Sequence, residues 1–286
     1  MLEIVASTRS RRRAEAWALA LSSQGISNGL GSARGSWQLS VEEGEAARAR
    51  AVVDAYEREN QARPEPPEVV PEYGRTGIGF ALAAAILLFF AVTGPRDFSV
   101  AWFERGSADA DAILSGELWR AVTALTLHAD FTHAFGNALA CALFVTVVCR
   151  AHGPGVGGAL ILAAGVAGNF MNAAYHESHH SSVGSSTALF GAVGILAGMQ
   201  FARRRRLRSR RARAWVPLAG GLGLLAMLGT GARADLGAHL FGLLAGTGLG
   251  AAATLWIGRP AGAVAQWLAG ACALATLLIA WLLALH

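Results

Sequence analysis

The sequence predicts an all-α polytopic membrane protein that carries a small α/β domain at its N-terminus. Of its 286 residues, 53% are hydrophobic and only 15% are charged, whereas a soluble domain normally carries about 25% charged residues. The chain also changes near residue 75 from a polar, charge-rich stretch to long apolar runs. These observations exclude an ordinary soluble enzyme and an intrinsically disordered chain.

The first 60 residues predict a separate domain with the element order β-α-β-β-α, and residues 61–76 predict a stiff, proline-rich linker. Alternating side chains favour the first strand, closely spaced glycines favour a hairpin, and Ala, Glu and Arg favour the helices. The expected elements are a strand at 2–7, a helix at 11–24, a hairpin at 26–41 and a helix at 42–60.

Seven apolar runs follow, and each is a candidate transmembrane helix. They lie at about 77–94, 133–148, 155–175, 183–202, 215–231, 236–258 and 261–285. Residues 77–258 would form a six-helix core, and residues 259–286 would add one further transmembrane helix. Cys141, Cys149 and Cys272 all lie in apolar runs, so we expect small buried hydrophobes and no disulfide framework.

Arginine placement predicts the orientation of these spans. Eight arginines lie between Arg203 and Arg213, in the loop after the fourth run, and short arginine-rich loops face the cytoplasm. Counting spans from this loop places the N-terminal domain in the cytoplasm and the C-terminus outside, in a multi-pass protein of the cell (inner) membrane. The alternative, nucleic-acid binding, is less expected than contact with anionic lipid headgroups. We therefore expect the lipid bilayer, and no nucleic acid, as a partner.

Polar side chains recur in the outer parts of the second, fourth and sixth spans. Such groups are costly in a bilayer and mark candidate functional sites. A histidine beside a serine can accept the proton of the hydroxyl and so activate it as a nucleophile. Side-chain and backbone N–H groups near the start of the fourth span can stabilise a developing oxyanion. These side chains are His128, His133 and Asn137 in the second span, Ser185 and Ser186 in the fourth, and His239 in the sixth.

Glycines favour contact between the fourth and sixth spans. Gly242, Gly246 and Gly250 are four residues apart and form one small-residue stripe directly after His239. Small residues allow membrane helices to approach closely. This approach is what a direct hydrogen bond between a serine and His239 requires.

Several separated motifs, in one order over roughly residues 77–258, resemble those of the rhomboid intramembrane serine proteases. The resemblance implies a rhomboid-like six-helix core with one extra C-terminal transmembrane helix. It also implies hydrolysis of peptide bonds in or near transmembrane segments of membrane proteins. The motifs are Trp119 and Arg120 in the first external loop, His128, His133 and Asn137, then Gly184, Ser185 and Ser186 followed by Ala188, Phe190 and Gly191, and finally Ala238 and His239 with Gly242 and Gly246.

The resemblance implies a role for each matched residue and no cofactor or metal. Ser186 would be the nucleophile and His239 the base, as a dyad. His133 and Asn137, with the Ser186 backbone N–H, would form the oxyanion hole, and Phe190 would pack on His239. Supporting roles fall to His128, Gly184, Gly242, Trp119 and Arg120, of which Trp119 and Arg120 are expected to brace their loop.

Two features leave alternatives open. Thr187 stands where the family usually has glycine, so its side chain would crowd the substrate groove or change the oxyanion geometry. Ser185 adjoins Ser186, although Gly184 two residues earlier favours Ser186 as the nucleophile. The alternative function is a rhomboid-fold pseudoprotease that binds membrane proteins without cleaving them. A transporter is disfavoured because the sequence shows no inverted repeat.

A polar cluster precedes the fourth span, formed by His176, Glu177, His179 and His180. We expect no metal there, because a loop provides no evident fixed geometry or supporting shell. Asp235 is expected to cap a helix rather than orient His239. The sequence leaves open whether the N-terminal domain regulates the protein, holds substrates or partners, or aids folding, and no pattern indicates an oligomeric state or a particular substrate.

Overall fold

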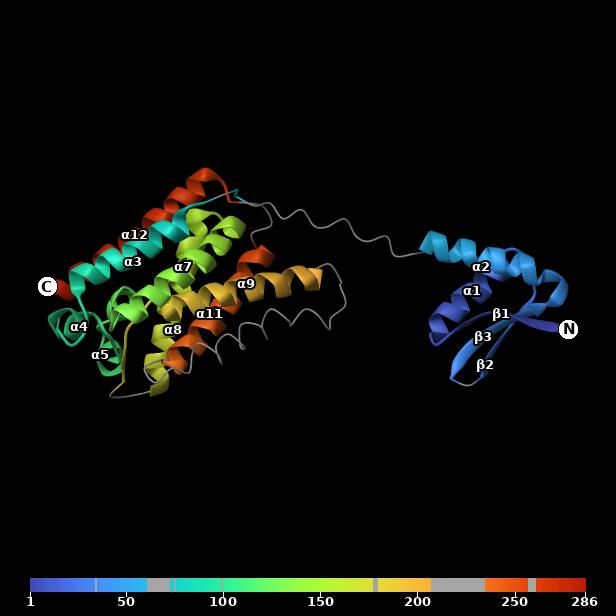
Figure 1. Cartoon of the computed structure of the whole chain (residues 1–286), viewed down its shortest axis with the longest axis horizontal. Coiled ribbons are helices and arrows are strands. Elements are labelled where there is room, and N and C mark those ends of the chain that lie inside the picture. The colour runs from blue at the N-terminus through green and yellow to red at the C-terminus, as the bar shows by residue number, and fades with distance from the viewer. Residues whose placement is uncertain are drawn as a thin grey trace. The chain divides into compact units, whose positions relative to one another are not determined.

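The computed structural model describes residues 1–33, 35–60, 73–74, 76–98, 100–176, 180–206, 235–256 and 261–286. The chain divides into two compact units, Met1–Val69 and Val70–His286, which are coloured along the chain in Figure 1. Each unit is described separately. The predicted fifth span at 215–231 and most of the arginine-rich loop lie outside the described residues.

The N-terminal unit has the expected β-α-β-β-α order. Its antiparallel sheet has the strand order β1-β3-β2. The second helix begins at Ala46 rather than at residue 42, because Glu43–Glu45 forms one turn of 3-10 helix around the poor helix former Gly44. The elements are β1 (Leu2–Thr8), α1 (Arg11–Ser23), β2 (Asn28–Ala33), β3 (Ser36–Glu42) and α2 (Ala46–Asn60).

The core of this unit follows from two periodicities. Trp17 and Leu21 are four residues apart on α1, whereas Leu39 and Val41 alternate on β3, and all four side chains are buried in one cluster with Val53 of α2. The apolar residues at helical spacing and those at strand spacing therefore form a single apolar layer between the helices and the sheet.

The second unit is helical (Figure 1). Three short helices lie in the loop after the first long helix, and two residue pairs form a small β-ladder. The long helices are α3 (Ile78–Thr93), α7 (Phe131–His152), α8 (Pro154–His176), α9 (Ser186–Arg206), α11 (Leu236–Trp256) and α12 (Ala263–Leu285). The short elements are α4 (Val100–Gly106), β4 (Ala108–Asp109), α5 (Ala110–Leu114), α6 (Arg120–Thr123) and β5 (Ser181–Ser182).

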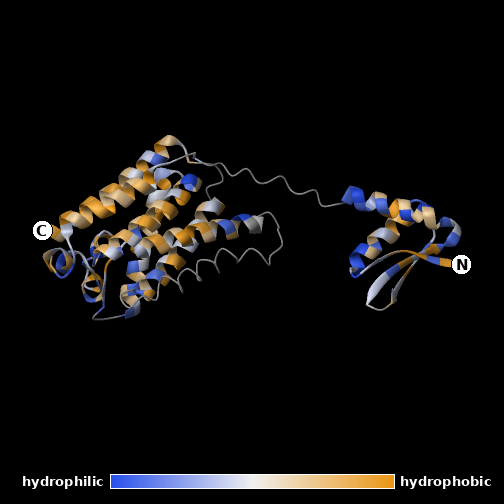
Figure 2. Ribbon diagram, viewed as in Figure 1, coloured by the Kyte–Doolittle hydropathy of each residue, from blue (hydrophilic) through white to orange (hydrophobic). Residues whose placement is uncertain are grey.

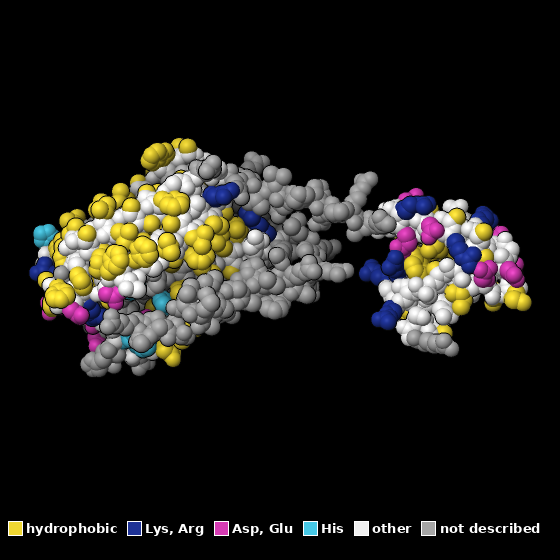
Figure 3. All heavy atoms as spheres, in the orientation of Figure 1, with side chains coloured by type: hydrophobic (Ala, Val, Ile, Leu, Met, Phe, Trp, Pro, Cys, Tyr) yellow, Lys and Arg dark blue, Asp and Glu magenta, His cyan; other side chains and the backbone are white. Residues whose placement is uncertain are grey.

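Four of the described helices are long and apolar enough to cross a membrane: α7, α8, α11 over Leu236–Leu255, and α12. Of these, α12 has the most exposed apolar surface, because only 11% of its apolar 18-residue stretch is buried inside the protein. The shorter helix α3 has 16 residues, and α9 ends in four arginines. In Figure 2 the ribbon of this unit has mostly hydrophobic colours, and Figure 3 shows apolar side chains gathered over the visible face of its described part. Such a surface is expected to contact lipid.

Glycines bring α9 and α11 into backbone contact, as the sequence predicts. A Cβ atom added at Gly246 would lie 2.8 Å from the carbonyl carbon of Gly191, and one at Gly250 would lie 2.6 Å from the Cα atom of Ile195. Both distances are shorter than van der Waals contact. Any larger residue would therefore push these two helices apart.

The last helix is joined to the rest of its unit by a buried amide. Gln266 of α12 accepts hydrogen bonds from the N–H groups of Gly155 and Val156, both at 2.9 Å, and donates one to the carbonyl of His152 at 2.9 Å. The first N–H groups of a helix have no partner within it. Gln266 therefore caps the start of α8 and fastens α12 to the α7–α8 connection.

Candidate active site

Ser186 and His239 meet at the ends of two helices. Ser186 is the first residue of α9, and His239 lies in the first turn of α11. The Oγ atom of Ser186 is 2.8 Å from Nε2 of His239. When Nε2 is the unprotonated ring nitrogen, the hydroxyl donates this hydrogen bond. The pair thus has the geometry of a nucleophile and its general base.

The ring of His239 is held by an aromatic contact. Phe190 lies one turn after Ser186 and stacks on His239, with ring centroids 4.6 Å apart and an interplanar angle of 28°. The other ring nitrogen, Nδ1, is buried and has no hydrogen-bond partner among the described residues. The described structure therefore shows a pair without a third orienting group.

The two adjacent serines face different imidazoles. The Oγ atom of Ser185 lies 3.2 Å from Nε2 of His128, and the Ser185 N–H also points to that nitrogen at 3.4 Å. Ser186 instead pairs with His239. Of the two serines, Ser186 is the one that lies beside His239, and its role as the nucleophile stays a prediction.

His133 and Asn137 point from α7 towards Gly184. They are four residues apart and share one face of the helix. A Cβ atom at Gly184 would lie 2.7 Å from Nε2 of His133 and 3.5 Å from Nδ2 of Asn137. Gly184 has a φ of 126°, a backbone conformation that residues with a side chain rarely adopt. Glycine therefore leaves room for both side chains two residues before Ser186.

Asn137 carries an unused hydrogen-bond donor at this place. Its Nδ2 atom is buried and has no acceptor among the described residues, although buried polar groups are normally paired. Ser186 begins α9, so its backbone N–H has no acceptor within the helix. Two donors are thus available near the start of α9, and the positive end of the helix dipole favours negative charge there.

Thr187 lies inside the helix packing and not on an open surface. Its side chain is 4% exposed. Its methyl carbon would lie 2.7 Å from a Cβ atom at Gly168 and 3.2 Å from one at Gly242. The methyl group therefore fills space that two glycines leave free on α8 and α11. This position gives no support to the expectation that Thr187 crowds a substrate groove.

Arg120 braces the loop between α3 and α7. Its side chain donates hydrogen bonds to Glu117 at 2.6 Å and to the carbonyls of Glu104 at 2.7 Å and Ser107 at 3.3 Å. The neighbouring Trp119 has a buried indole N–H without an acceptor among the described residues. The hydrogen bonds of Arg120 thus tie three parts of this loop together, and the bracing role of Trp119 stays a prediction.

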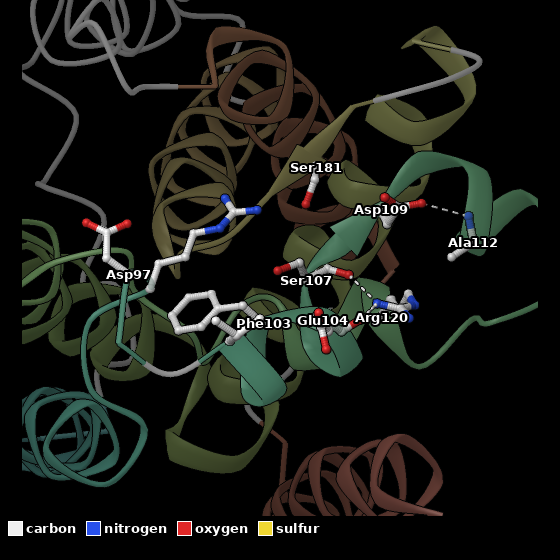
Figure 4. Close-up of a pocket in the computed structure, with 10 residues that line it drawn as sticks. Asp97, Phe103, Glu104, Ser107, Asp109, Ala112, Arg120 and Ser181 are labelled. Atoms are coloured by element: carbon white, nitrogen blue, oxygen red, sulfur yellow. Dashed lines mark hydrogen bonds between the residues drawn. The ribbon is translucent and has the colours of Figure 1, made fainter.

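A cavity of about 620 Å³ opens beside this loop (Figure 4). The Ser186–His239 pair does not line it. This cavity is therefore distinct from the candidate active site. Its lining residues are Arg96, Asp97, Val100, Phe103, Glu104, Ser107, Asp109, Ala112, Arg120 and Ser181.

Asp235 caps α11 and does not bond to the ring of His239. Its Oδ1 atom accepts the Ala238 N–H at 3.0 Å. Its Oδ2 atom lies 2.7 Å from both Nδ2 of Asn172 and Nε2 of His180. Burial alone would raise the pKa of this carboxyl, but these hydrogen bonds outweigh burial and hold the pKa below its ordinary value.

Sequence reasoning overlooked two asparagines of α8. Asn169 donates a hydrogen bond to the carbonyl of Ala121 at 2.9 Å, which ties α8 to α6 in the loop between α3 and α7. Asn172 binds Asp235 at the start of α11. The available signal was the presence of two amides in an otherwise apolar span, since buried polar groups need partners.

Comparisons with known proteins point to one family. Residues 115–256 match the family model of the rhomboid domain. The chain is 28% identical over 166 residues to "Putative rhomboid protease YdcA" of Bacillus subtilis (strain 168), an alignment that covers 58% of this chain and 81% of that protein. It is 30% identical over 169 residues to "Rhomboid protease GluP" of the same organism, covering 58% of this chain but only 32% of that protein.

Proposed function

Because this chain carries a rhomboid domain, we propose that it is an intramembrane serine protease. It would hydrolyse peptide bonds in or near the transmembrane segments of other membrane proteins. The observation that carries the proposal is the 2.8 Å separation of Ser186 Oγ from His239 Nε2. The contact joins helices far apart in sequence that pack through backbone at their glycines.

In the first half of the reaction, Ser186 Oγ attacks the carbonyl carbon of the scissile peptide and its proton passes to Nε2 of His239. The tetrahedral adduct collapses when Nε2 returns the proton to the departing amine nitrogen and the C–N bond breaks. An ester on Ser186 remains. Base assistance of this kind contributes roughly 10²–10⁴-fold in rate.

In the second half, a water molecule gives a proton to Nε2 and attacks the ester carbonyl. The bond to Ser186 Oγ then breaks and Oγ regains a proton. Phe190 keeps the imidazole plane in place through both halves, because it stacks on the ring at 4.6 Å. No other protein group needs to change protonation in this scheme.

Negative charge develops on the substrate oxygen in each adduct. The unpartnered Nδ2 of Asn137, the Ser186 N–H and the ring of His133 are the proposed donors to this oxyanion, since all three lie around Gly184 and the start of α9. Removing one such donor typically costs about 10²–10³-fold in rate. We therefore expect Asn137→Ala to lower kcat by that order with a smaller effect on KM.

The rhomboid domain and the four apolar helices indicate a multi-pass membrane protein. We propose further that it lies in the cell (inner) membrane with its N-terminal unit in the cytoplasm. The support is the run of eight arginines between Arg203 and Arg213, which favours the cytoplasmic side. Cysteine accessibility at engineered sites on each side of the membrane would test this orientation.

Cleavage of a model transmembrane substrate in proteoliposomes tests the proposed activity. Ser186→Ala and His239→Ala are each expected to abolish cleavage while the protein stays folded. Ser185→Ala is the matched control, because it removes the neighbouring hydroxyl and leaves the Ser186–His239 pair intact. Continued cleavage by Ser186→Ala would refute the assignment of the nucleophile.

Labelling with a fluorophosphonate probe separates a protease from a pseudoprotease with the same fold. An activated serine reacts with the probe, so wild-type protein and Ser185→Ala should label, and Ser186→Ala should not. A wild-type protein that binds membrane proteins but neither labels nor cleaves would favour the pseudoprotease. The buried position of Thr187 (4% exposed) removes one reason for expecting that outcome.

A further inference from the structure

A second group of polar side chains gathers at the external end of this unit, outside the proposed dyad. His176 is the last residue of α8, His180 lies in the loop that leads to β5, and Asp235 directly precedes α11. One potential ligand atom from each of the three residues lies within 4.8 Å of the others. Three separate segments therefore converge on one point.

The two imidazoles are aligned with each other. The rings of His176 and His180 stack with centroids 3.8 Å apart and an interplanar angle of 13°. Nε2 of His180 is 2.7 Å from Oδ2 of Asp235, and these two side chains are 28% and 14% exposed. The group is thus sheltered but open to small solutes.

Hydrogen bonds to backbone groups fix the main chain at His180 and the carboxylate of Asp235. The carbonyl of His180 accepts the N–H of Ala110 at 2.8 Å, next to the pairing of β4 with β5. Oδ1 of Asp235 accepts the Ala238 N–H at 3.0 Å. The fixed geometry that a free loop would lack is therefore present.

A buried amide oxygen points into the same place without a partner. Asn172 is 2% exposed, and its Oδ1 atom has no hydrogen-bond partner among the described residues. A Cβ atom built on Gly237 would lie 3.4 Å from both Nε2 of His176 and Oδ1 of Asp235 and would contact Oδ1 of Asn172. The absence of a side chain at Gly237 thus leaves a small space ringed by acceptor atoms.

We propose that His176, His180 and Asp235 bind a divalent transition-metal ion of the zinc type. Two imidazoles and one carboxylate form a donor set that suits zinc and leaves a fourth position for water. Asn172 Oδ1 is placed to accept a hydrogen bond from that water, a supporting contact typical of such sites. This inference revises the sequence-based expectation of no metal.

Metal binding would replace the hydrogen bond between His180 and Asp235 with coordination. It would also turn one of the two stacked imidazoles, because an ion lies in the plane of each imidazole ring that binds it. The shared proton leaves, because a ligating imidazole must present a lone pair to the ion. The ion would then cross-link the end of α8, the loop before β5 and the start of α11. Since His239 lies one turn after Asp235, the site would stiffen the helix end that carries the proposed base.

Binding of Co²⁺ to the full-length protein tests this proposal directly. The protein is purified in detergent with a tag that contains no histidine, and it is titrated with Co²⁺, whose visible absorption reports coordination by protein ligands. One equivalent should produce the absorption bands, and Zn²⁺ should displace them. His176→Gln and His180→Gln should each weaken binding by at least about 100-fold, because each loses a direct ligand and the loss of a supporting contact alone costs about 10–100-fold.

His286→Gln, which changes the exposed C-terminal histidine, is the matched control and should bind Co²⁺ as the wild type does. His176→Gln decides the question if His180→Gln does not fold, since it leaves the hydrogen bond between His180 and Asp235 in place. Absent bands in the wild type, or equal binding by His176→Gln, would overturn the proposal. The measurement does not depend on proteolysis, so its failure would leave the proposed activity untouched.

Discussion

Gly242→Ala is expected to disable the proposed dyad without altering any residue in it. Gly242 lies on α11, three residues after His239, where the helix rests on the backbone of Thr187 in α9. An added Cβ atom would lie 3.0 Å from the carbonyl carbon of Thr187 and closer still to its oxygen. These are backbone atoms, so no side-chain rotation can relieve the overlap.

The required displacement can be compared with the length of the catalytic hydrogen bond. Ordinary contact needs 3.4–4 Å, so the helices must separate by on the order of 1 Å. Overpacking of this kind costs about 1–3 kcal/mol. The Ser186–His239 distance of 2.8 Å would lengthen by a similar amount, beyond useful hydrogen-bond range. Loss of base assistance lowers the rate by roughly 10²–10⁴-fold.

The assay compares Gly242→Ala with Gly248→Ala, a substitution on the same helix. A Cβ atom at Gly248 would meet nothing within 4 Å, so this control changes composition and helix propensity equally but causes no overlap. Cleavage of a transmembrane substrate and thermal unfolding in detergent are measured for both variants. We expect Gly242→Ala to lose both activity and stability and Gly248→Ala to keep both.

Wild-type cleavage by Gly242→Ala would refute the reasoning, because it would show that close helix contact is not needed to hold the pair. Equal losses in both variants would refute it as well, since the effect would then come from glycine content and not from contact with Thr187. A stability loss confined to Gly242→Ala with unchanged kcat would show that the helices separate without moving Ser186 away from His239.

Three further changes have defined expectations. Phe190→Ala should lower kcat with a smaller effect on KM, and it should destabilise the protein by about 3–5 kcal/mol, because it removes a buried ring stacked on His239. An unchanged kcat would contradict a positioning role. Thr187→Gly should cost about 1–2 kcal/mol in thermal unfolding without raising kcat/KM, because the lost methyl group fills helix packing; faster cleavage would instead indicate crowding. Gln266→Ala should destabilise the protein by about 1–3 kcal/mol by leaving two N–H groups of α8 unpaired, whereas Gln200→Ala, at an exposed position on α9, should not.

Much of the fold is predictable from the sequence because it rests on local periodicity. Hydropathy alone locates α7, α8, α11 and α12 to within a few residues, and alternating and helical patterns predict the order of elements in the N-terminal unit. The start of α2 is the exception, because the pattern of charge and alanine extends through Gly44 whereas the regular helix begins only at Ala46.

The candidate site is only partly predictable. The position of a residue along its span gives its depth in the membrane. By this measure Ser186, His239, His133 and Asn137 have similar depths and are expected to lie near one another. Depth does not decide which way a side chain points. Asn172 was overlooked for that reason, because its partner, Asp235, lies 63 residues away in the sequence.

The sequence by itself thus determined a membrane-embedded helical core, a separate polar domain, and the level at which the polar side chains gather, because hydropathy and spacing are local properties. Only the tertiary structure decided which side chains meet. It paired Ser186 with His239 and Ser185 with His128. It directed the side chain of Thr187 into the space lined by glycines between the helices. It also brought His176, His180 and Asp235 close together. These outcomes depend on helix rotation and close backbone contact, which arise only when the segments pack together.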